Sequence, residues 1–236
     1  MLTDHLRSFP PGFRALVLGA SGGIGSAFVQ HLQADPRCAL VVGLGRSTVP
    51  PIDFEREATV AEAAAVLAPQ GPFHLVVVAT GVLHGPEGMP EKRLGQLHYA
   101  QMQACLRTNA MGPALAMAQF APLLARDRSV LAVLSAKVGS IGDNRLGGWY
   151  SYRASKAALN MFLKTAAIEV QRSNPQAALV ALHPGTVDSA LSAPFRGAEI
   201  GRPAADAAAD MLRVIDGLTP ECTGGFYAYS GQPLPW

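Results

Sequence analysis

Two side chains that could share a proton, Tyr152 and Lys156, lie four residues apart near the start of a long helical pattern. Residues at i and i+4 lie on one face of a helix, so both side chains can reach the same small volume. A phenol ordinarily titrates at about pH 10, and a neighbouring cation favours its ionised form. The pair could therefore exchange a proton with a substrate, although the same spacing also occurs by chance. Tyr150 has no such partner, because Arg153 and Ala154 follow it at these spacings.

A glycine-rich stretch follows the first predicted strand and opens the first predicted helix. It reads Gly19-Ala20-Ser21-Gly22-Gly23-Ile24-Gly25. Glycines in such a turn let backbone amides approach a pyrophosphate at the positive end of the helix. The stretch therefore predicts a dinucleotide site, and the residues expected to line it are Gly19, Ser21, Gly23, Ile24 and Gly25.

The same stretch has a second interpretation. It also fits the Gly-x-Ser-x-Gly turn that exposes the nucleophile of α/β-hydrolases, with Ser21 as that nucleophile. His183 could complete a triad only with Asp53 or Asp143, and no motif places either carboxylate. The hydrolase turn normally follows a strand in the middle of the sheet, whereas this one follows the first strand. We therefore keep a hydrolase as a minor alternative.

The end of the second predicted strand bears on the choice of cofactor. NAD-specific sites commonly carry an acidic residue about 20 residues beyond the glycines, but Arg46 stands there instead. A guanidinium suits a 2′-phosphate through its charge and its forked donors. We therefore expect NADP, with NAD as the alternative and a solvated surface arginine as the plain interpretation. Asp53 could accept a hydrogen bond from the adenine amino group, or merely end a strand.

Asn109 lies in a helical pattern that Gly112 and Pro113 interrupt. Asparagine is unfavourable inside a helix, and the Gly-Pro pair predicts a kink or a break. Asn109 could be functional or could be satisfied locally at the kink. Gly81, which follows the strand predicted at residues 75–79, would let the backbone pass close to a cofactor ribose.

The composition predicts a compact globular domain. The 236 residues are 49% hydrophobic and 15% charged, with a formal net charge of +2, which gives no broad attraction to nucleic acid or to an anionic membrane. The longest apolar runs are strand-sized or broken, so we expect no membrane span. Residues 1–7 lack the apolar segment of a secretory signal. Three widely spaced cysteines, Cys38, Cys105 and Cys222, indicate the reduced thiols of a cytoplasmic protein and no metal site.

Short apolar runs alternate with longer alanine-rich segments, which is typical of βαβ units and a parallel sheet. We predict strands over residues 15–18, 40–44, 75–79, 130–134, 178–182 and 225–229, and helices over residues 24–33, 60–67, 99–125, 152–172 and 204–212. The sequence shows no internal repeat or linker. The prediction is a single α/β domain, a doubly wound parallel sheet of Rossmann type with helices on both faces, which follows an N-terminal extension at residues 1–13.

Taken together, these motifs resemble the short-chain dehydrogenase/reductase family. The resemblance rests on the following features in this order: the glycine stretch, Asp53, Ala79-Thr80-Gly81, Asn109, Ser135, Tyr152-x-x-x-Lys156 and Pro184-Gly185. It runs from about Arg14 to the end of the chain. Within the family, residues 135–144 and 148–153 are similar to the C-factor and sniffer-type carbonyl reductase branch.

The resemblance implies hydride transfer between a nicotinamide and a small carbonyl or alcohol substrate. Tyr152 would protonate the carbonyl oxygen in reduction or accept the proton in oxidation. Lys156 would lower the pKa of Tyr152 and hold the nicotinamide ribose. Ser135 would hydrogen-bond the reacting oxygen, and Asn109 would hold a water that leads to Lys156. Further cofactor contacts implied by the family are Arg46, Asp53, Phe54, Ala79, Thr80, Gly81, Pro184, Gly185, Val187 and Ser189.

Ser140, in the loop that follows Ser135, is a second candidate for the contact with the reacting oxygen. In many relatives two serines end this strand and the second one is functional, whereas here the pair is Ser135-Ala136. Side chains alternate across a strand, so Ser135 would point away from the expected direction if the strand stayed regular. Ser140 follows Gly139 in the next loop and is the other candidate. We favour Ser135, because it ends a buried strand where ligands gather in doubly wound sheets.

The resemblance also implies features beyond the reacting groups. Residues 190–203 would form a short substrate lid, and the helices predicted at residues 99–125 and 152–172 would pair across a two-fold axis in a homodimer or homotetramer. Phe120, Met161 and Phe162 could instead face their own sheet. A C-factor-like signalling protein, in which NADP binding matters more than turnover, is the alternative function. The joint presence of Tyr152 and Lys156 favours the enzyme.

Overall fold

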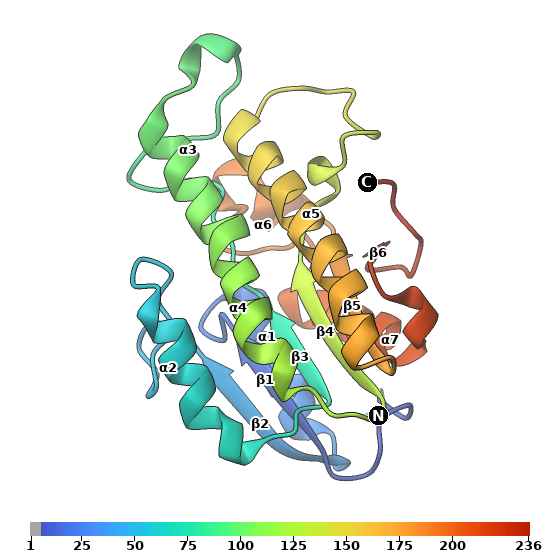
Figure 1. Cartoon of the computed structure of the whole chain (residues 1–236). Coiled ribbons are helices and arrows are strands. Elements are labelled where there is room, and N and C mark those ends of the chain that lie inside the picture. Colours follow the sequence, from blue (N-terminus) through green and yellow to red (C-terminus); the bar gives the residue numbers. More distant parts are fainter. Residues whose placement is uncertain (1–5) are drawn as a thin grey trace.

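The computed structural model describes residues 6–236 of the chain. Six strands form one parallel sheet in the order β2-β1-β3-β4-β5-β6 (Figure 1). Their bounds are β1 Phe13–Leu18, β2 Cys38–Leu44, β3 Leu75–Val78, β4 Ser129–Leu134, β5 Ala177–His183 and β6 Gly225–Ala228. Every strand predicted from the sequence is present, and the predicted fold class is confirmed.

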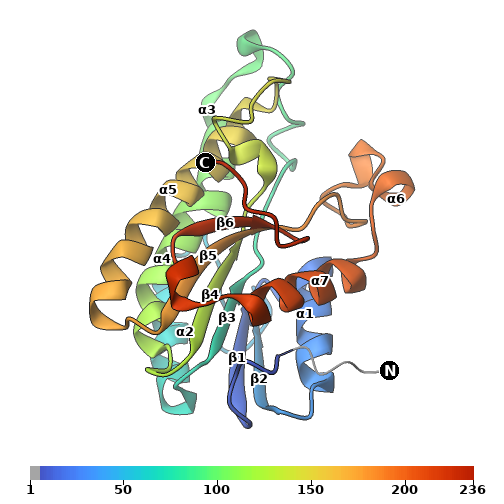
Figure 2. The same ribbon diagram turned by 90° about the vertical axis from the view of Figure 1, so that its right-hand side faces the viewer.

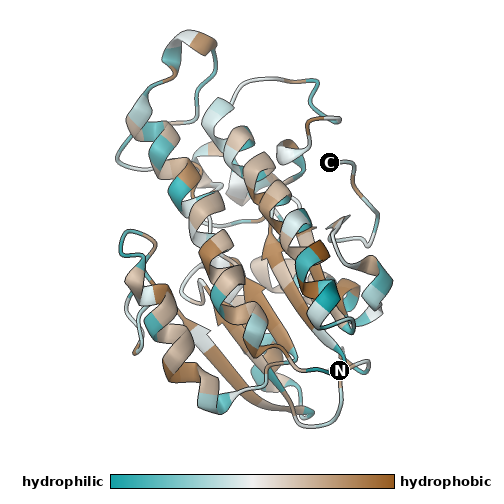
Figure 3. Cartoon of the chain, in the orientation of Figure 1, coloured by the Kyte–Doolittle hydropathy of each residue, from teal (hydrophilic) through white to brown (hydrophobic). Residues whose placement is uncertain are grey.

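Helices cover both faces of this sheet. Their bounds are α1 Gly23–Ala34, α2 Ala58–Leu67, α3 Tyr99–Leu106, α4 Gly112–Phe120, α5 Tyr150–Ser173, α6 Gly197–Ile200 and α7 Ala204–Gly217. Helices α2, α4 and α5 lie on one face, and α1 and α7 lie on the other (Figure 2). Because both faces are covered, every residue of β4 is buried, and the strands are the most continuously hydrophobic elements (Figure 3).

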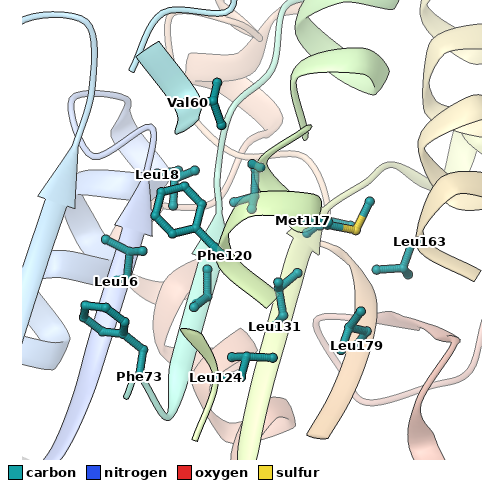
Figure 4. Packing of buried hydrophobic residues seen from close by; sticks show 14 of the residues in the cluster. Leu16, Leu18, Val60, Phe73, Met117, Phe120, Leu124, Leu131, Leu163 and Leu179 are labelled. Atoms are coloured by element: carbon teal, nitrogen blue, oxygen red, sulfur yellow. The ribbon is translucent and has the colours of Figure 1, made fainter. Parts of the chain in front are cut away.

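The two helical layers bury separate apolar clusters against the sheet. On one side, Met117 and Phe120 of α4 pack with Leu163 of α5 and with leucines of β1 and β4 (Figure 4). On the other side, side chains of α1 and α7 pack together with Leu6 and Phe9. The described part of the predicted N-terminal extension therefore belongs to the core, whereas residues 1–5, which include most of the segment considered as a signal, lie outside the described residues.

The connections run in opposite directions from β1. The chain passes from β1 through α1 to β2 at one edge of the sheet, then returns through α2 to β3 on the other side of β1. Such a reversal leaves a crevice at the carboxyl ends of the two central strands, where ligands bind in doubly wound sheets. The glycine stretch after β1 and Ala79-Thr80-Gly81 after β3 both lie at this reversal.

The helix predicted over residues 99–125 is divided into several segments. A π-helical segment, Arg107–Met111, joins α3 to α4, and a 3-10 turn follows α4 at Ala121–Leu123. The predicted interruption is thus confirmed, but it lies before Gly112 and the chain stays helical through Pro113. Gly112 is required for packing, because a Cβ there would lie 2.2 Å from the ring of Phe54. Among the described residues, no helix combines the length and apolar character needed to cross a bilayer.

Candidate active site

The proposed proton-exchanging pair lies in the first two turns of α5. The side chains of Tyr152 and Lys156 are both buried, with residue exposures of 8% and 3%. The Nζ atom of Lys156 lies 5.9 Å from the centre of the Tyr152 ring, and it donates a hydrogen bond to the carbonyl oxygen of Leu134 at 2.8 Å. Because Leu134 ends β4, this bond fixes the lysine at the carboxyl edge of the sheet. The i, i+4 spacing therefore brings the pair together as predicted.

Burial dominates the ionisation of both groups. It raises the pKa of the Tyr152 phenol well above its ordinary value, and Cys105 raises it further. Burial also lowers the pKa of Lys156 to about 8, against a smaller opposite effect of Cys105. The sequence led us to expect that Lys156 would lower the pKa of Tyr152. Burial of the phenol instead raises that pKa, and the ammonium group of Lys156 donates to a backbone carbonyl.

Asn109 lies in the π-helical segment, fully buried. Its amide oxygen accepts from the Val82 N–H at 2.8 Å, and its amide nitrogen donates to the Val82 carbonyl at 2.8 Å and to the Ser155 hydroxyl at 3.0 Å. A Cβ on Gly81 would lie 3.6 Å from Lys156 Nζ and 3.7 Å from Asn109 Oδ1. Asn109 and Lys156 therefore meet at the backbone that follows β3. The π-helical segment is typical of functional sites.

The serine at the end of β4 points toward α5. The hydroxyl of Ser135 donates to Asn160 Oδ1 at 2.6 Å, whereas Ala136 packs in the apolar cluster that contains Tyr152. This is the direction that regular strand alternation predicted for Ser135. Ser140 is also buried, and its hydroxyl accepts from the Asp143 N–H at 3.1 Å. The assignment of the reacting-oxygen contact to Ser135 stays a prediction.

Asn160 is a polar residue of this region that the sequence did not single out. It lies one turn beyond Lys156, and its amide nitrogen is buried without a hydrogen-bond partner among the described residues. Its position at i+4 from Lys156 was the only available signal, because that spacing places it on the same helix face.

The glycine stretch forms a close-packed cradle in which Gly19 and Gly25 leave little room for a side chain. Gly19 has φ +84°, and a Cβ there would lie 3.0 Å from the carbonyl carbon of Ala79. A Cβ on Gly25 would lie 2.1 Å from the Gly19 carbonyl oxygen. The Thr80 hydroxyl is buried beside this cradle without a partner among the described residues. A close-packed backbone with an unused polar group fits a nucleotide that brings its own hydrogen-bonding groups.

Other predicted cofactor residues gather at the same edge. A Cβ on Gly45 would lie 3.4 Å from Ser21 Oγ, so the exposed Arg46 follows β2 directly beside the glycine stretch. A Cβ on Gly23 would lie 3.7 Å from the Cβ of Ser189, which brings the segment after β5 to the start of α1. Ile24 packs partly buried against the core on the α1 side of the sheet.

The Pro184-Gly185 turn follows β5 at the same edge. Gly185 has φ +78° and lies against the ring of Tyr229, 2.8 Å from where a Cβ would be. Val187 is buried and pairs with Arg202 in an isolated bridge. These contacts fix the segment for which the family resemblance implied cofactor contacts.

Asp53 and Phe54 lie in the connection before α2. The Asp53 carboxylate accepts from the Glu55 N–H at 3.1 Å and pairs with Arg56 at 3.2 Å, while Phe54 packs over Gly112. Asp53 therefore organises the turn that leads into α2 and does not end a strand. Its contact with an adenine, and that of Phe54, stay predictions.

The hydrolase triad is not assembled. Burial, with a smaller effect of Lys137, lowers the pKa of His183 to about 4, and its Nδ1 atom has no partner among the described residues. Asp143 pairs with Lys137 at 3.5 Å, and Asp53 pairs with Arg56. Neither acid considered for the triad orients His183, so the hydrolase alternative loses its support.

Apolar and aromatic side chains surround Tyr152. The Trp149 ring meets it edge-on with centroids 6.1 Å apart, and Phe195 lies 5.0 Å from Trp149. Leu83 and Leu191 belong to the same cluster. Phe195 and Leu191 come from the predicted lid at residues 190–203, which contains a 3-10 turn, Ala193–Phe195, and the short helix α6.

Known proteins resemble this chain over nearly its whole length. The family model for short chain dehydrogenases matches residues 14–199. The 1-hydroxy-2-glutathionyl-2-methyl-3-butene dehydrogenase of Rhodococcus sp. (strain AD45) is 30% identical over 230 residues, which cover 94% of this chain and 98% of that protein. The C-signal of Myxococcus xanthus is 37% identical over 145 residues, which cover 61% of this chain and 83% of that protein.

Solved structures share the fold. An NADPH-bound carbonyl reductase from chicken fatty liver superposes with a TM-score of 0.81 at 22% identity, covering 99% of this chain and 98% of that one. The carbonyl reductase Sniffer of D. melanogaster gives 0.81 at 22% identity, covering 95% and 99%. A short-chain dehydrogenase/reductase from Burkholderia multivorans with bound NADP gives 0.79 at 25% identity, covering 96% and 100%. Together with the parallel sheet, the glycine cradle and the Tyr152–Lys156 pair, these matches show that the chain belongs to the short-chain dehydrogenase family of oxidoreductases.

Proposed function

We propose that this chain is an NADP-dependent carbonyl reductase in which Tyr152 exchanges the proton with the substrate oxygen. The observation that carries the proposal is the approach of Lys156 and Asn109 to the backbone at Gly81, with the Tyr152 ring 5.9 Å from the Lys156 Nζ atom. Two similar structures hold a bound NADPH or NADP. When bound, the nicotinamide nucleotide supplies or accepts the hydride, and the chain's own residues position it and handle the proton.

The cofactor-binding residues follow from the cradle. Backbone amides of the Gly19–Gly25 turn, with Ser21 and Ser189, would hold the pyrophosphate at the start of α1. Arg46 would pair with the 2′-phosphate, and Thr80 would use its unpaired hydroxyl toward the ribose. The remaining contacts of the proposal are Ile24, Asp53, Phe54, Ala79, Gly81, Pro184, Gly185 and Val187.

The ionisation of the pair determines which group carries the proton. Because burial raises the pKa of Tyr152, the phenol stays protonated through the neutral range and carries the proton that reduction of a carbonyl needs. Lys156, with a pKa of about 8, is charged at neutral pH and can help to stabilise the phenolate left after transfer. Asn109 would support resupply of the proton through a water at the kinked backbone, and Ser135 remains the proposed hydroxyl near the reacting oxygen.

The surroundings of Tyr152 favour an apolar substrate. Trp149, Phe195, Leu83 and Leu191 offer aromatic and aliphatic surface next to the phenol. Apolar contact of this kind gives affinity to a hydrocarbon or aromatic group beside the carbonyl. We therefore propose aromatic or aliphatic ketones, aldehydes and quinones as the substrate class.

Replacing Tyr152 by phenylalanine tests the proton donor. We expect Tyr152→Phe to lower turnover by about 10²- to 10⁴-fold, because the phenyl ring retains the packing but carries no proton. Turnover is measured as NADPH oxidation against a panel of apolar ketones, aldehydes and quinones. Tyr150→Phe, an exposed tyrosine two residues away, is the matched control and should retain full activity. Unchanged turnover in Tyr152→Phe would favour a signalling protein that needs cofactor binding only.

Reversing the charge at Arg46 tests cofactor choice. We expect NADPH to bind at least tenfold more tightly than NADH, a difference of about 1.4 kcal/mol, and Arg46→Asp to reverse the preference. Arg145→Asp makes the same charge change on an exposed loop outside the cradle and should leave the ratio unchanged. Titration calorimetry with both cofactors gives the dissociation constants, and equal values for the unaltered protein would rule out the role of Arg46.

Exposed apolar side chains on α5 suggest that two copies of the chain associate. Phe120 is fully buried against its own sheet, whereas Met161 and Phe162 of α5 are 68% and 45% exposed. We propose that this face pairs with a second copy in a homodimer or homotetramer. Light scattering at micromolar concentration should give a multiple of 24.7 kDa, and Phe162→Glu should shift the mass toward the monomer. A monomer mass for the unaltered protein would contradict the proposal.

The buried lysine should leave a signature in stability against pH. Burial lowers the pKa of Lys156 from 10.5 in the unfolded chain to about 8 in the folded protein. Between these values the unfolded state binds more protons, so this group favours the folded state increasingly as pH rises from about 8 to 10.5, and that gain is lost as pH falls back to about 8. The melting temperature of the cofactor-free protein, minus that of Lys156→Met, should therefore rise between about pH 8 and pH 10.5. A constant difference would show that the ammonium group is not buried.

A further inference from the structure

The first turn of α5 receives its hydrogen-bond acceptor from a distant part of the chain. Trp149 precedes the helix in the left-handed region, at φ +54°, and provides no side-chain cap. The first N–H groups of a helix need acceptors from outside the helix. Here the Glu91 carboxyl group accepts from the Ser151 N–H at 3.1 Å and from the Ser151 hydroxyl. The Glu91 carbonyl oxygen also accepts from the Trp149 N–H at 2.5 Å.

These three bonds fix the residues directly before Tyr152. Glu91 is 3% exposed and Ser151 is 4% exposed, so both groups are withdrawn from water. A buried carboxyl group that meets the positive end of a helix is held there by its hydrogen bonds and by the helix dipole. We call these three hydrogen bonds of Glu91 the clamp. The clamp also holds Trp149, whose ring lies against Tyr152 and Phe195, in its left-handed conformation.

Glu91 also ties the segment after β3 to the catalytic helix. Asn109 holds the beginning of that segment through both backbone groups of Val82, and Glu91 joins it to α5 nine residues further on. Both Glu91 and Lys156 act on the buried Cys105, where Glu91 raises and Lys156 lowers the thiol pKa beneath a larger effect of burial. The carboxyl group therefore lies in the same buried region as the reacting pair.

We infer that Glu91 is a positioning residue that sets the location of Tyr152 by clamping Trp149 and Ser151. It does not touch the substrate, and it acts through the first turn of α5. The inference rests on the proposed role of Tyr152 as proton donor. A residue with a purely structural role would change stability alone, whereas a positioning residue must change turnover in the folded protein.

Three variants separate these roles. Glu91→Ala removes both carboxyl hydrogen bonds to Ser151 and keeps only the backbone bond to Trp149. We expect it to lower kcat by about 10²-fold, the loss typical of a small displacement of a reacting group, with NADPH affinity unchanged because the glycine cradle is untouched. Glu91→Gln keeps an amide oxygen that can accept from the Ser151 N–H, so it should recover kcat to within about tenfold of the unaltered protein. Asn174→Ala is the matched control.

Asn174 is a suitable control because it ties the opposite end of α5 in a comparable way. It is buried, ends the helix, and donates to the Ala125 carbonyl at 2.9 Å. Asn174→Ala should lower the melting temperature and leave kcat unchanged. All kinetics are measured well below the lowest melting temperature, with circular dichroism confirming the folded state. A Glu91→Ala protein that melts earlier but keeps the kcat of the unaltered protein would overturn the inference.

A second readout does not depend on turnover. The chain has two tryptophans, so in a Trp236→Phe background the fluorescence of Trp149 reports on the start of α5. Glu91→Ala should shift the Trp149 emission and increase its quenching by acrylamide, Glu91→Gln should do so weakly, and Asn174→Ala should not. Unchanged Trp149 emission in Glu91→Ala would overturn the clamp even if Tyr152→Phe abolishes turnover. Altered emission in a protein that reduces no substrate on the panel would support the clamp and reject the proposed function alone.

Discussion

The contact between the ends of β1 and β3 is the constraint on which the rest of the site depends. The two strands are neighbours at the reversal of strand order, and Gly19, at φ +84°, lies so close to Ala79 that a Cβ there would be 3.0 Å from the Ala79 carbonyl carbon. The contact sets the glycine cradle against Thr80 and Gly81. Gly81 in turn lies against Lys156 and Asn109, so a series of close contacts joins the start of α1 to the reacting pair on α5.

Most of the fold could be predicted because it depends on the apolar pattern of each strand, which is visible in a short stretch of sequence. A parallel sheet covered on both faces needs strands that are apolar at every position, and β4, with all its residues buried, is the clearest case. The division of residues 99–125 into α3, a π-helical segment and α4 could be predicted only in part. Gly112 and Pro113 predicted an interruption of the helix. The π-helical form of that interruption depends on the packing of Phe54 over Gly112 and on the hydrogen bond between Asn109 and Val82. Those partners lie far away in the sequence, so no local pattern contains them.

Some features of the site could likewise be predicted from the sequence, and others could not. Tyr152 and Lys156 were found from their spacing, because both lie on one helix and the helix fixes their relation. Strand alternation predicted that Ser135 would point away from the direction expected of the functional serine, and its hydroxyl bonds to Asn160. The ionisation of Tyr152 did not follow, since it depends on burial that only the assembled fold supplies. Glu91 gave no signal at all, because a lone glutamate in a loop is usually solvated and only its three-dimensional contacts set it apart.

The buried polar residues of α5 have a common explanation in these contacts. Ser151, Ser155 and Asn160 lie four and five residues apart, are at most 4% exposed, and point to different sides of the buried part of the helix. Each bonds to a different segment: Ser151 to Glu91, Ser155 to Asn109, and Asn160 to the end of β4. Apolar packing alone is non-directional and would let a helix slide or rotate on the sheet, whereas buried hydrogen bonds fail when donor and acceptor move apart. The three links thus fix α5 along and around its axis, and Tyr152 and Lys156 lie between the first and the last of them. A helix with leucine or alanine at these three positions would bury its surface equally well. It would not hold the phenol and the ammonium group at a defined place.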